Sequence, residues 1–197
     1  MRRLFLTLFI LALAAPSFAI TGISIGIHGG KTTNYDQESF AIPGQDDADM
    51  TMVGGQIKIS KLPMIDLLVS GDYAWKNETY SVAGQDLEVK RHDLAFSATA
   101  LYPLKLKVIQ PYIGGGISTH NLGFDYVKPL SLSLEDNNVV IPESDNRLGY
   151  HMVGGFEIAL PAFPVGLNAE YRLNWIDTPV EVTKYNSITV GLSYKLP

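Results

Sequence analysis

One short segment of the sequence holds the residue types of a nucleophilic catalytic site. Ser118, His120 and Asp125 follow one another closely. Acyl transfer needs a serine hydroxyl, an imidazole that takes its proton and a carboxylate that orients the imidazole, all within hydrogen-bonding reach. A serine and a histidine on one face of a strand are also a common chance pairing. We therefore expect no catalytic residues here and no enzymatic activity.

Residues that could hold a metal ion or a phosphate lack the spacing that those ligands need. The four histidines contain no His-x-x-x-His pair. Gly114-Gly115-Gly116 is not followed by a helical pattern, so close packing explains it better than a phosphate-binding loop. Asp46-Asp47-Ala48-Asp49 has no EF-hand spacing and would hold a divalent cation only weakly. We expect no cofactor and no dedicated metal site.

A period-2 pattern identifies the elements that carry these residues. In residues 165–175, Val, Leu, Ala, Tyr, Leu and Trp alternate with Gly, Asn, Glu, Arg and Asn, which indicates a strand with one apolar and one polar face. A soluble sandwich buries its apolar face, whereas a membrane barrel turns that face toward lipid. The same alternation predicts strands at residues 20–32, 50–60, 65–76, 88–102, 108–120, 148–160, 165–175 and 185–196, with the facing of the fifth ambiguous.

The N-terminus indicates export. Residues 1–19 contain Arg2 and Arg3, an apolar run and a final Pro16-Ser17-Phe18-Ala19, the parts of a cleaved secretory signal peptide. Residues 20–197 then form one domain. The chain has no cysteine, which is typical of a bacterial envelope protein rather than a disulfide-bonded secreted scaffold. Without Arg2 and Arg3, 13 basic residues remain against 20 acidic ones, a net charge of −7, which argues against nucleic acid as a partner.

The lengths of the predicted strands and of their connections distinguish the membrane barrel from the soluble sandwich. Most runs have 11 or more residues, and a tilted strand needs roughly 9–11 to cross a bilayer. Short, proline-containing connections at 61–64, 103–107 and 161–164 alternate with long polar ones at 33–49, 77–87, 121–146 and 176–184. Short turns at one rim and long loops at the other are typical of outer-membrane barrels. We predict an all-β fold, an eight-stranded antiparallel up-and-down transmembrane β-barrel.

Aromatic residues should mark the two membrane interfaces of such a barrel. Those expected at the long-loop rim are Tyr73, Trp75, Tyr150, Trp175 and Tyr185, and those expected at the short-turn rim are Tyr102, Tyr112, Phe163 and Tyr194.

The chain resembles the small eight-stranded outer-membrane barrels of the OmpA/OmpX type over essentially all of residues 20–197. The signal peptide, the segment Gln110-Pro111-Tyr112-Ile113-Gly114-Gly115-Gly116 and the alternating last strand carry the resemblance. It implies a bacterial outer-membrane location, contact with outer-membrane lipids and lipopolysaccharide, and insertion by the barrel-assembly machinery. Family members usually end in an aromatic residue, whereas this chain ends Tyr194-Lys195-Leu196-Pro197.

Charged residues on the polar faces should meet inside the barrel. An interior of eight strands is just filled by its own side chains, and an unpaired buried charge is costly. We expect a lumen charge network at one depth, in which Glu157 and Glu170 pair with Arg172 or Lys58.

Two classes of function follow. The first is a non-enzymatic outer-membrane barrel with a structural or surface-interaction role, in which the acidic loops 33–49 and 121–146 present a surface to a ligand. The alternative is an outer-membrane lipid-modifying enzyme with a rim Ser/His site, similar to lipid A deacylases. Those enzymes carry His-x-Ser on one strand, whereas the order here is Ser118-Thr119-His120. A soluble periplasmic barrel of lipocalin type is a third, more distant alternative.

Overall fold

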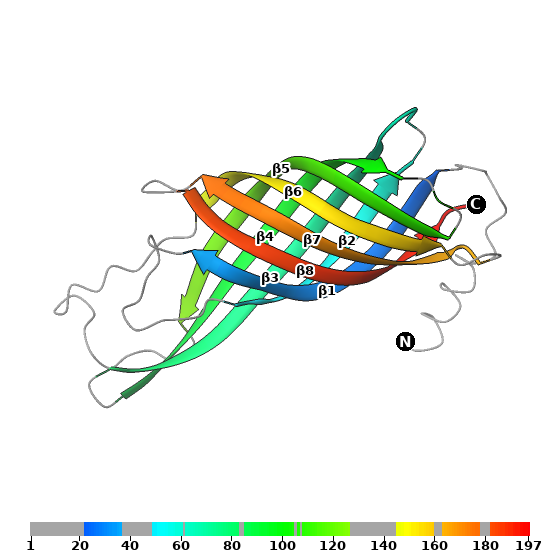
Figure 1. Ribbon diagram of the computed structural model, residues 1–197. Helices are drawn as coiled ribbons and strands as arrows, with labels where there is room; N and C mark the ends of the chain where they lie inside the picture. The colour runs from blue at the N-terminus through cyan, green and yellow to red at the C-terminus, as the bar shows by residue number, and fades with distance from the viewer. Residues whose placement is uncertain are drawn as a thin grey trace.

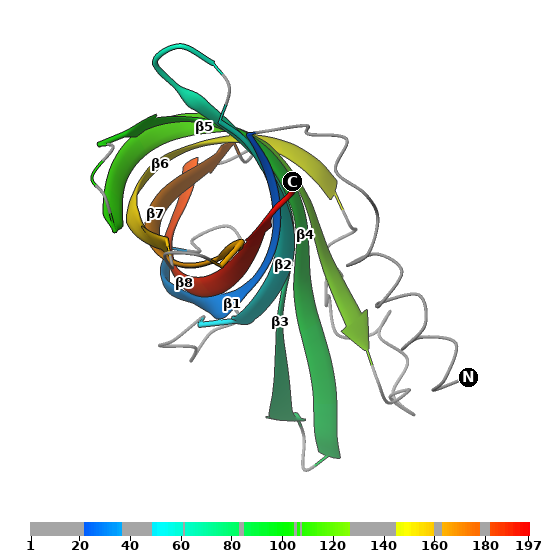
Figure 2. The same cartoon turned by 90° about the vertical axis from the view of Figure 1, so that its right-hand side faces the viewer.

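The chain forms a closed antiparallel barrel (Figures 1 and 2). The computed structural model describes residues 22–36, 49–60, 62–82, 85–104, 106, 108–126, 145–159, 163–177 and 182–197. Its strands are β1 (Ile23–Asp36), β2 (Thr51–Ile59), β3 (Asp66–Val82), β4 (Gln85–Pro103), β5 (Ile109–Tyr126), β6 (Asp145–Ala159), β7 (Val165–Asp177) and β8 (Val182–Lys195). Each pairs with its neighbours in sequence and β1 pairs with β8, so the predicted fold class is confirmed. The expected signal peptide, residues 1–19, lies outside the described residues.

Side chains alternate along the strands between an apolar outer face and a polar interior. Ile27, Ile117 and Val190 are between 64% and 69% exposed on the outside, whereas Thr99 and Glu157 are buried inside. Closure of the barrel wall pairs β1 with β8 and so leaves no open sheet edge within it, which a bilayer requires because lipid tails offer no hydrogen bonds. In the described part of the chain, no helix is long and apolar enough to span a membrane.

The strands of one hairpin continue well past the barrel. β3 and β4 pair all the way to Val82 and Gln85, although β2 pairs with β3 only as far as Trp75. The outer part is a two-stranded ribbon that leaves the barrel wall (Figure 2). The prediction of a loop at residues 77–87 is therefore wrong, because most of this segment belongs to β3 and β4. The apolar alternation here is limited to Tyr80 and Val82 on one strand and Leu87 and Val89 on the other, which is shorter than the runs from which the other strands were predicted.

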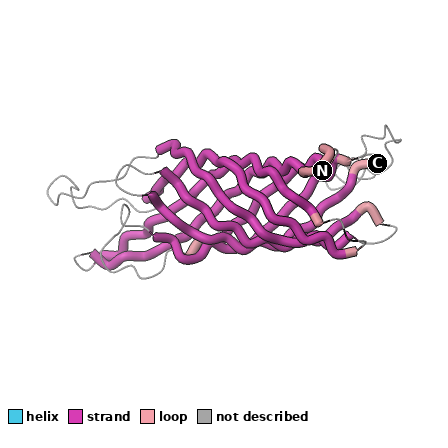
Figure 3. The backbone as a smooth tube through the Cα atoms, turned by 45° about the horizontal axis from the view of Figure 1, so that its top comes forward, coloured by secondary structure: helices cyan, strands magenta, loops and turns pink. Residues whose placement is uncertain are grey.

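The opposite end of the barrel carries the short connections, and the C-terminus lies there too (Figures 1 and 3). The connection between β2 and β3 runs from Ser60 to Ile65, and Ser60 N–H donates to the carbonyl of Gly22 at the start of β1. Leu196 N–H donates to the carbonyl of Ile23, so the last residues extend the pairing of β8 with β1. We refer below to the short-turn end and the long-loop end.

The register settles the facing of β5, which the sequence left open. Ile113 and Ile117 are each 69% exposed on the outside, so the intervening Gly114 and Gly116 face inward. A Cβ atom at Gly114 or Gly116 would collide with the backbone oxygen of Ala100 or Ala98 on β4. The glycine triplet is thus explained by the close approach of two backbones.

Most, but not all, interfacial aromatics are found where they were expected. Two stacked outward pairs flank the long-loop rim: Tyr73 with Trp75, with centroids 5.6 Å apart, and Tyr150 with Trp175, at 5.3 Å. At the short-turn rim, Tyr102 and Phe163 are exposed. The prediction is wrong for Tyr112 and Tyr185, which are only 7% and 6% exposed and point into the lumen. Their strand parity, rather than their distance from a rim, decides which way they face.

Candidate functional site in the barrel lumen

Side chains close the lumen with two apolar layers. The layer at the long-loop end, which we call the apolar cap, consists of Met50, Met52, Ala74, Leu122, Ile176 and Tyr185. The lower apolar layer consists of Leu68, Leu101, Tyr112 and Val153. Polar residues lie between the two layers, and β3 and β5 each contribute a residue to both layers. On β3, for example, Ala74 of the cap is followed by Asp72 and Ser70 and then by Leu68 of the lower layer.

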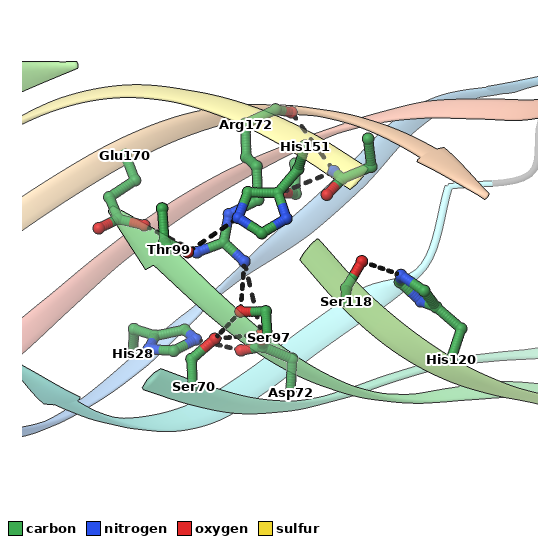
Figure 4. A network of polar contacts seen from close by, with 12 residues as sticks. His28, Ser70, Asp72, Ser97, Thr99, Ser118, His120, His151, Glu170 and Arg172 are labelled. Atoms are coloured by element: carbon green, nitrogen blue, oxygen red, sulfur yellow. Dashed lines mark hydrogen bonds and ion pairs between the residues drawn. The ribbon is translucent and has the colours of Figure 1, made fainter. Parts of the chain in front are cut away.

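Arg172 is the central charge of the polar region (Figure 4). Its Nη2 lies 3.3 Å from Glu170 Oε2, and its Nη1 lies 3.8 Å from Asp72 Oδ2. Nη1 is also 3.4 Å from Ser97 Oγ, to which it donates. Glu170 accepts a second hydrogen bond, of 2.7 Å, from the Tyr112 hydroxyl of the lower layer. One guanidinium therefore balances carboxylates from two strands, β3 and β7.

The Asp72 carboxylate is held by further partners. His28 Nε2 contacts Asp72 Oδ1, and Ser70 Oγ donates to Asp72 Oδ2 over 2.9 Å. Ser70 Oγ is in turn 2.8 Å from Ser97 Oγ. Arg172, Glu170 and Asp72 thus form a connected network in which each of these charges has more than one polar partner, as buried charges require.

A second group of charges lies near the short-turn end. Lys58 Nζ pairs with Glu157 Oε2, and Lys195 Nζ lies 3.4 Å from Glu157 Oε1. Lys58 and Lys195 also line a cavity of about 300 Å³, whose wall includes Ser60 and Asp66 beside the β2–β3 connection. Glu157 pairs with Lys58 and Glu170 with Arg172, as expected, but the two pairs lie at different depths rather than at one.

Ser118 and His120 do meet, but inside the barrel (Figure 4). Ser118 Oγ lies 2.9 Å from His120 Nε2, and His120 Nδ1 lies 2.8 Å from Asp93 Oδ2. The three residues are 7%, 2% and 3% exposed, so they are not at the lipid-facing rim. The side chain of Asp125, the carboxylate singled out in the sequence, lies outside what the structure describes.

Sequence reasoning missed Asp93 because strand register, not sequence proximity, brings it to His120. Asp93 faces inward on β4, and its strand pairs with β5 so that Asp93 is opposite Leu122 and Ala95 is opposite His120. The sequence did contain a signal for this contact. Asp93 and His120 each lie at an inward position of their predicted strands, and consecutive strands pair in an up-and-down barrel. Among the described residues, no three histidine or carboxylate side chains converge in a way that would hold a metal ion.

Comparisons with known proteins agree with this architecture. The family described as "Outer membrane protein beta-barrel domain" matches residues 4–195. No curated protein sequence gives a significant match. Among solved structures, Neisserial surface protein A (NspA) is 16% identical, with a TM-score of 0.59, over 89% of this chain and 98% of its own.

Two further structures share the fold at low identity. Ail, the attachment invasion locus protein of Yersinia pestis, solved with the heparin analogue sucrose octasulfate, is 11% identical, with a TM-score of 0.57, over 90% of this chain and 100% of its own. OprG of Pseudomonas aeruginosa is 14% identical, with a TM-score of 0.56, over 89% of this chain and 96% of its own. The closed eight-stranded architecture, the outward apolar face and the match over residues 4–195 show that the chain belongs to the outer-membrane β-barrel family and resides in the bacterial outer membrane.

Proposed function

We propose that this chain is a non-enzymatic structural and surface-interaction protein, in which the barrel is a scaffold and the long loops make the functional contacts. The observation that carries this proposal is the filled lumen. Two apolar layers and two groups of paired charges occupy the interior, so the described residues leave no wide path for general diffusion through the barrel. Rigid scaffolds commonly place their binding residues on loops.

The proposed scaffold role predicts an electrically silent barrel. Purified protein inserted into planar bilayers should give little or no steady conductance, because a hydrated ion cannot cross the apolar cap without losing its water shell. A conducting porin measured in the same bilayers is the positive control. Large, stable channels from this chain would contradict the filled-lumen interpretation.

Loop composition indicates the charge of the partner. Residues 33–49 contain five carboxylates and no lysine or arginine, and residues 121–146 contain five carboxylates and one lysine. Ail was solved with a polysulfated ligand, whereas loops of this composition would repel a polyanion. We infer a cationic or cation-bridged surface partner for this chain. The outward face would contact outer-membrane lipids and lipopolysaccharide after insertion by the barrel-assembly machinery.

Shortening the chain between β1 and β2 within residues 37–48, or between β5 and β6 within residues 127–144, should separate binding from folding. Binding of a polycationic probe such as polylysine to proteoliposomes should fall, while heat-modifiable folding and membrane insertion stay intact, because closure entropy changes only slowly with loop length. Trimming residues 82–85, where β3 is joined to β4, is the matched control. These four residues contain no carboxylate, so their removal should leave polylysine binding unchanged.

The alternative function, a lipid-modifying enzyme, requires a catalytic site that lipid can reach. A lipid-modifying site must reach the bilayer, yet Ser118 and His120 lie inside the barrel beneath the apolar cap. A change in lipid A acylation that depends on His120, detected by mass spectrometry of the membrane, would overturn the non-enzymatic proposal.

A further inference from the structure

We propose that Ser118 is an activated nucleophile that accepts an acyl or phosphoryl group from small, uncharged, water-soluble donors, with His120 as its general base and Asp93 positioning His120. This goes beyond the scaffold role: it assigns a covalent modification site inside the lumen and requires neither lipid as substrate nor repeated turnover. The three side chains come from neighbouring strands β4 and β5.

The hydrogen-bond geometry matches the tautomer that activation needs, with Asp93 ionised and the imidazole neutral. An ionised carboxylate can only accept, so the 2.8 Å contact with Asp93 Oδ2 places a proton on His120 Nδ1. In the neutral ring, Nε2 is then the acceptor, and the Ser118 hydroxyl, 2.9 Å away, donates to it. This arrangement lets the imidazole take the serine proton as the hydroxyl attacks.

The other histidines inside the barrel provide an internal comparison. His151 Nε2 is 2.8 Å from the Thr99 hydroxyl, but His151 Nδ1 has no hydrogen-bond partner among the described residues. His28 binds Asp72 through Nε2, and its Nδ1 is likewise without a hydrogen-bond partner. Within the described lumen, His120 is thus the histidine that joins a hydroxyl on one nitrogen to a carboxylate on the other.

The surroundings leave space at the nucleophile and supply donors for developing negative charge. Ser118 and His120 line a cavity of about 20 Å³, together with Arg172 and Asn174. Gly149, opposite Ser118 on β6, leaves room for the Ser118–His120 contact itself, since a Cβ there would lie 2.7 Å from Ser118 Oγ and 3.1 Å from His120 Nε2. The guanidinium and the amide that share the cavity can stabilise an oxyanion.

The cap defines the class of donor. A cavity of about 20 Å³ holds about one water molecule, so a donor must displace part of the cap. Met52 belongs to the cap and also lines the cavity, and methionine is a flexible side chain that adapts to a new neighbour. Tyr185 covers His120 edge-on, with ring centroids 6.2 Å apart. An apolar gate of this kind favours small uncharged donors over lipid A or charged phosphates.

The chemical step balances without a cofactor. Ser118 Oγ forms a bond to the carbonyl carbon of an activated ester as its proton moves to His120 Nε2. The bond from that carbon to the leaving oxygen then breaks, and the leaving alcohol departs with the proton from His120. For a fluorophosphonate, the oxygen–phosphorus bond forms, the phosphorus–fluorine bond breaks, and fluoride leaves while His120 releases the proton to water.

A fluorophosphonate probe tests the proposal on the folded full chain in detergent micelles. We expect a mass increase of one phosphonyl group on Ser118, located by peptide mass spectrometry, and its loss in Ser118→Ala and after heat denaturation. His120→Ala should lower the labelling rate by roughly 10²–10⁴-fold. Thr99→Val removes the hydroxyl beside His151 and is the matched control, in which labelling of Ser118 should be unchanged.

Two further variants test positioning and access. Asp93→Asn should lower the maximal labelling rate by about 10²-fold or more, while the half-saturating probe concentration stays constant, because orientation and not probe binding is lost. Met52→Ala should speed labelling, whereas Met152→Ala on the outer face should not. The proposal is overturned if Ser118 stays unlabelled in folded wild type and in folded Met52→Ala, or if His120→Ala labels at the wild-type rate.

Discussion

Replacing Arg172 with alanine is expected to cost ~3–5 kcal/mol of folding free energy, because it leaves buried carboxylates without their counter-charge. Arg172 contacts Glu170 and Asp72, whose side chains are 7% and 8% exposed between the apolar cap and the lower apolar layer. Water cannot readily replace the guanidinium there. Urea titration of folding into lipid vesicles, followed by tryptophan fluorescence and gel mobility, measures the loss.

A double-mutant cycle separates the ion pair from simple truncation. Arg172→Ala combined with Glu170→Gln should lose less stability than the sum of the single changes, by ~0.5–3 kcal/mol, because the second change removes one of the stranded charges. Lys195→Ala is the matched control, since Lys195 is 44% exposed and Glu157 keeps Lys58 as a partner. Equal losses for Arg172→Ala and Lys195→Ala would show that the mid-barrel network does not stabilise the fold.

The sequence predicted which charged residues enter the lumen and pair there better than the depth at which each pair lies. Alternation depends only on position along one strand, so Lys58, Glu157, Glu170 and Arg172 were all correctly assigned to the interior. Pairing depends on the stagger between strands, which alternation does not contain. The two ion pairs at different depths, and the contact of His120 with Asp93 rather than with a carboxylate near it in sequence, both follow from that stagger.

The ends of strands and the facing of aromatic residues were predicted less well than the interior positions of the charged residues. The outer part of β3 and β4 has only a short apolar alternation, Tyr80 and Val82 on one strand and Leu87 and Val89 on the other, so residues 77–87 were predicted as a loop although Asn77–Val82 pairs regularly with Gln85–Lys90. Tyr112 and Tyr185 lie near the rims in sequence, but inward parity places them in the lower layer and the cap. A tyrosine fits either the membrane interface or the lumen, because its ring is apolar and its hydroxyl can hydrogen-bond. In the lumen, the Tyr112 hydroxyl donates to the buried Glu170 carboxylate.

Placing arginine on the lipid face should destabilise the barrel according to depth. Val190 is 64% exposed on the outside, near the middle of β8, between Ala169 of β7 and Gly29 of β1. Val190→Arg should cost ~2–4 kcal/mol, as expected for a charge at the bilayer midplane. Leu192→Arg, one outward position closer to the short-turn rim, should cost less.

Leu196 provides the matched control for that depth dependence, because it follows the last residue of β8 at the short-turn rim. Leu196→Arg should cost only ~0–1 kcal/mol, since the guanidinium reaches the headgroup region there. Folding titrations of the three variants in one lipid then give a gradient along a single strand. A gradient that is flat, or that is largest at Leu196, would mean that the apolar band of β8 does not face the hydrocarbon core, and with it the inside-out assignment of the whole barrel would fail.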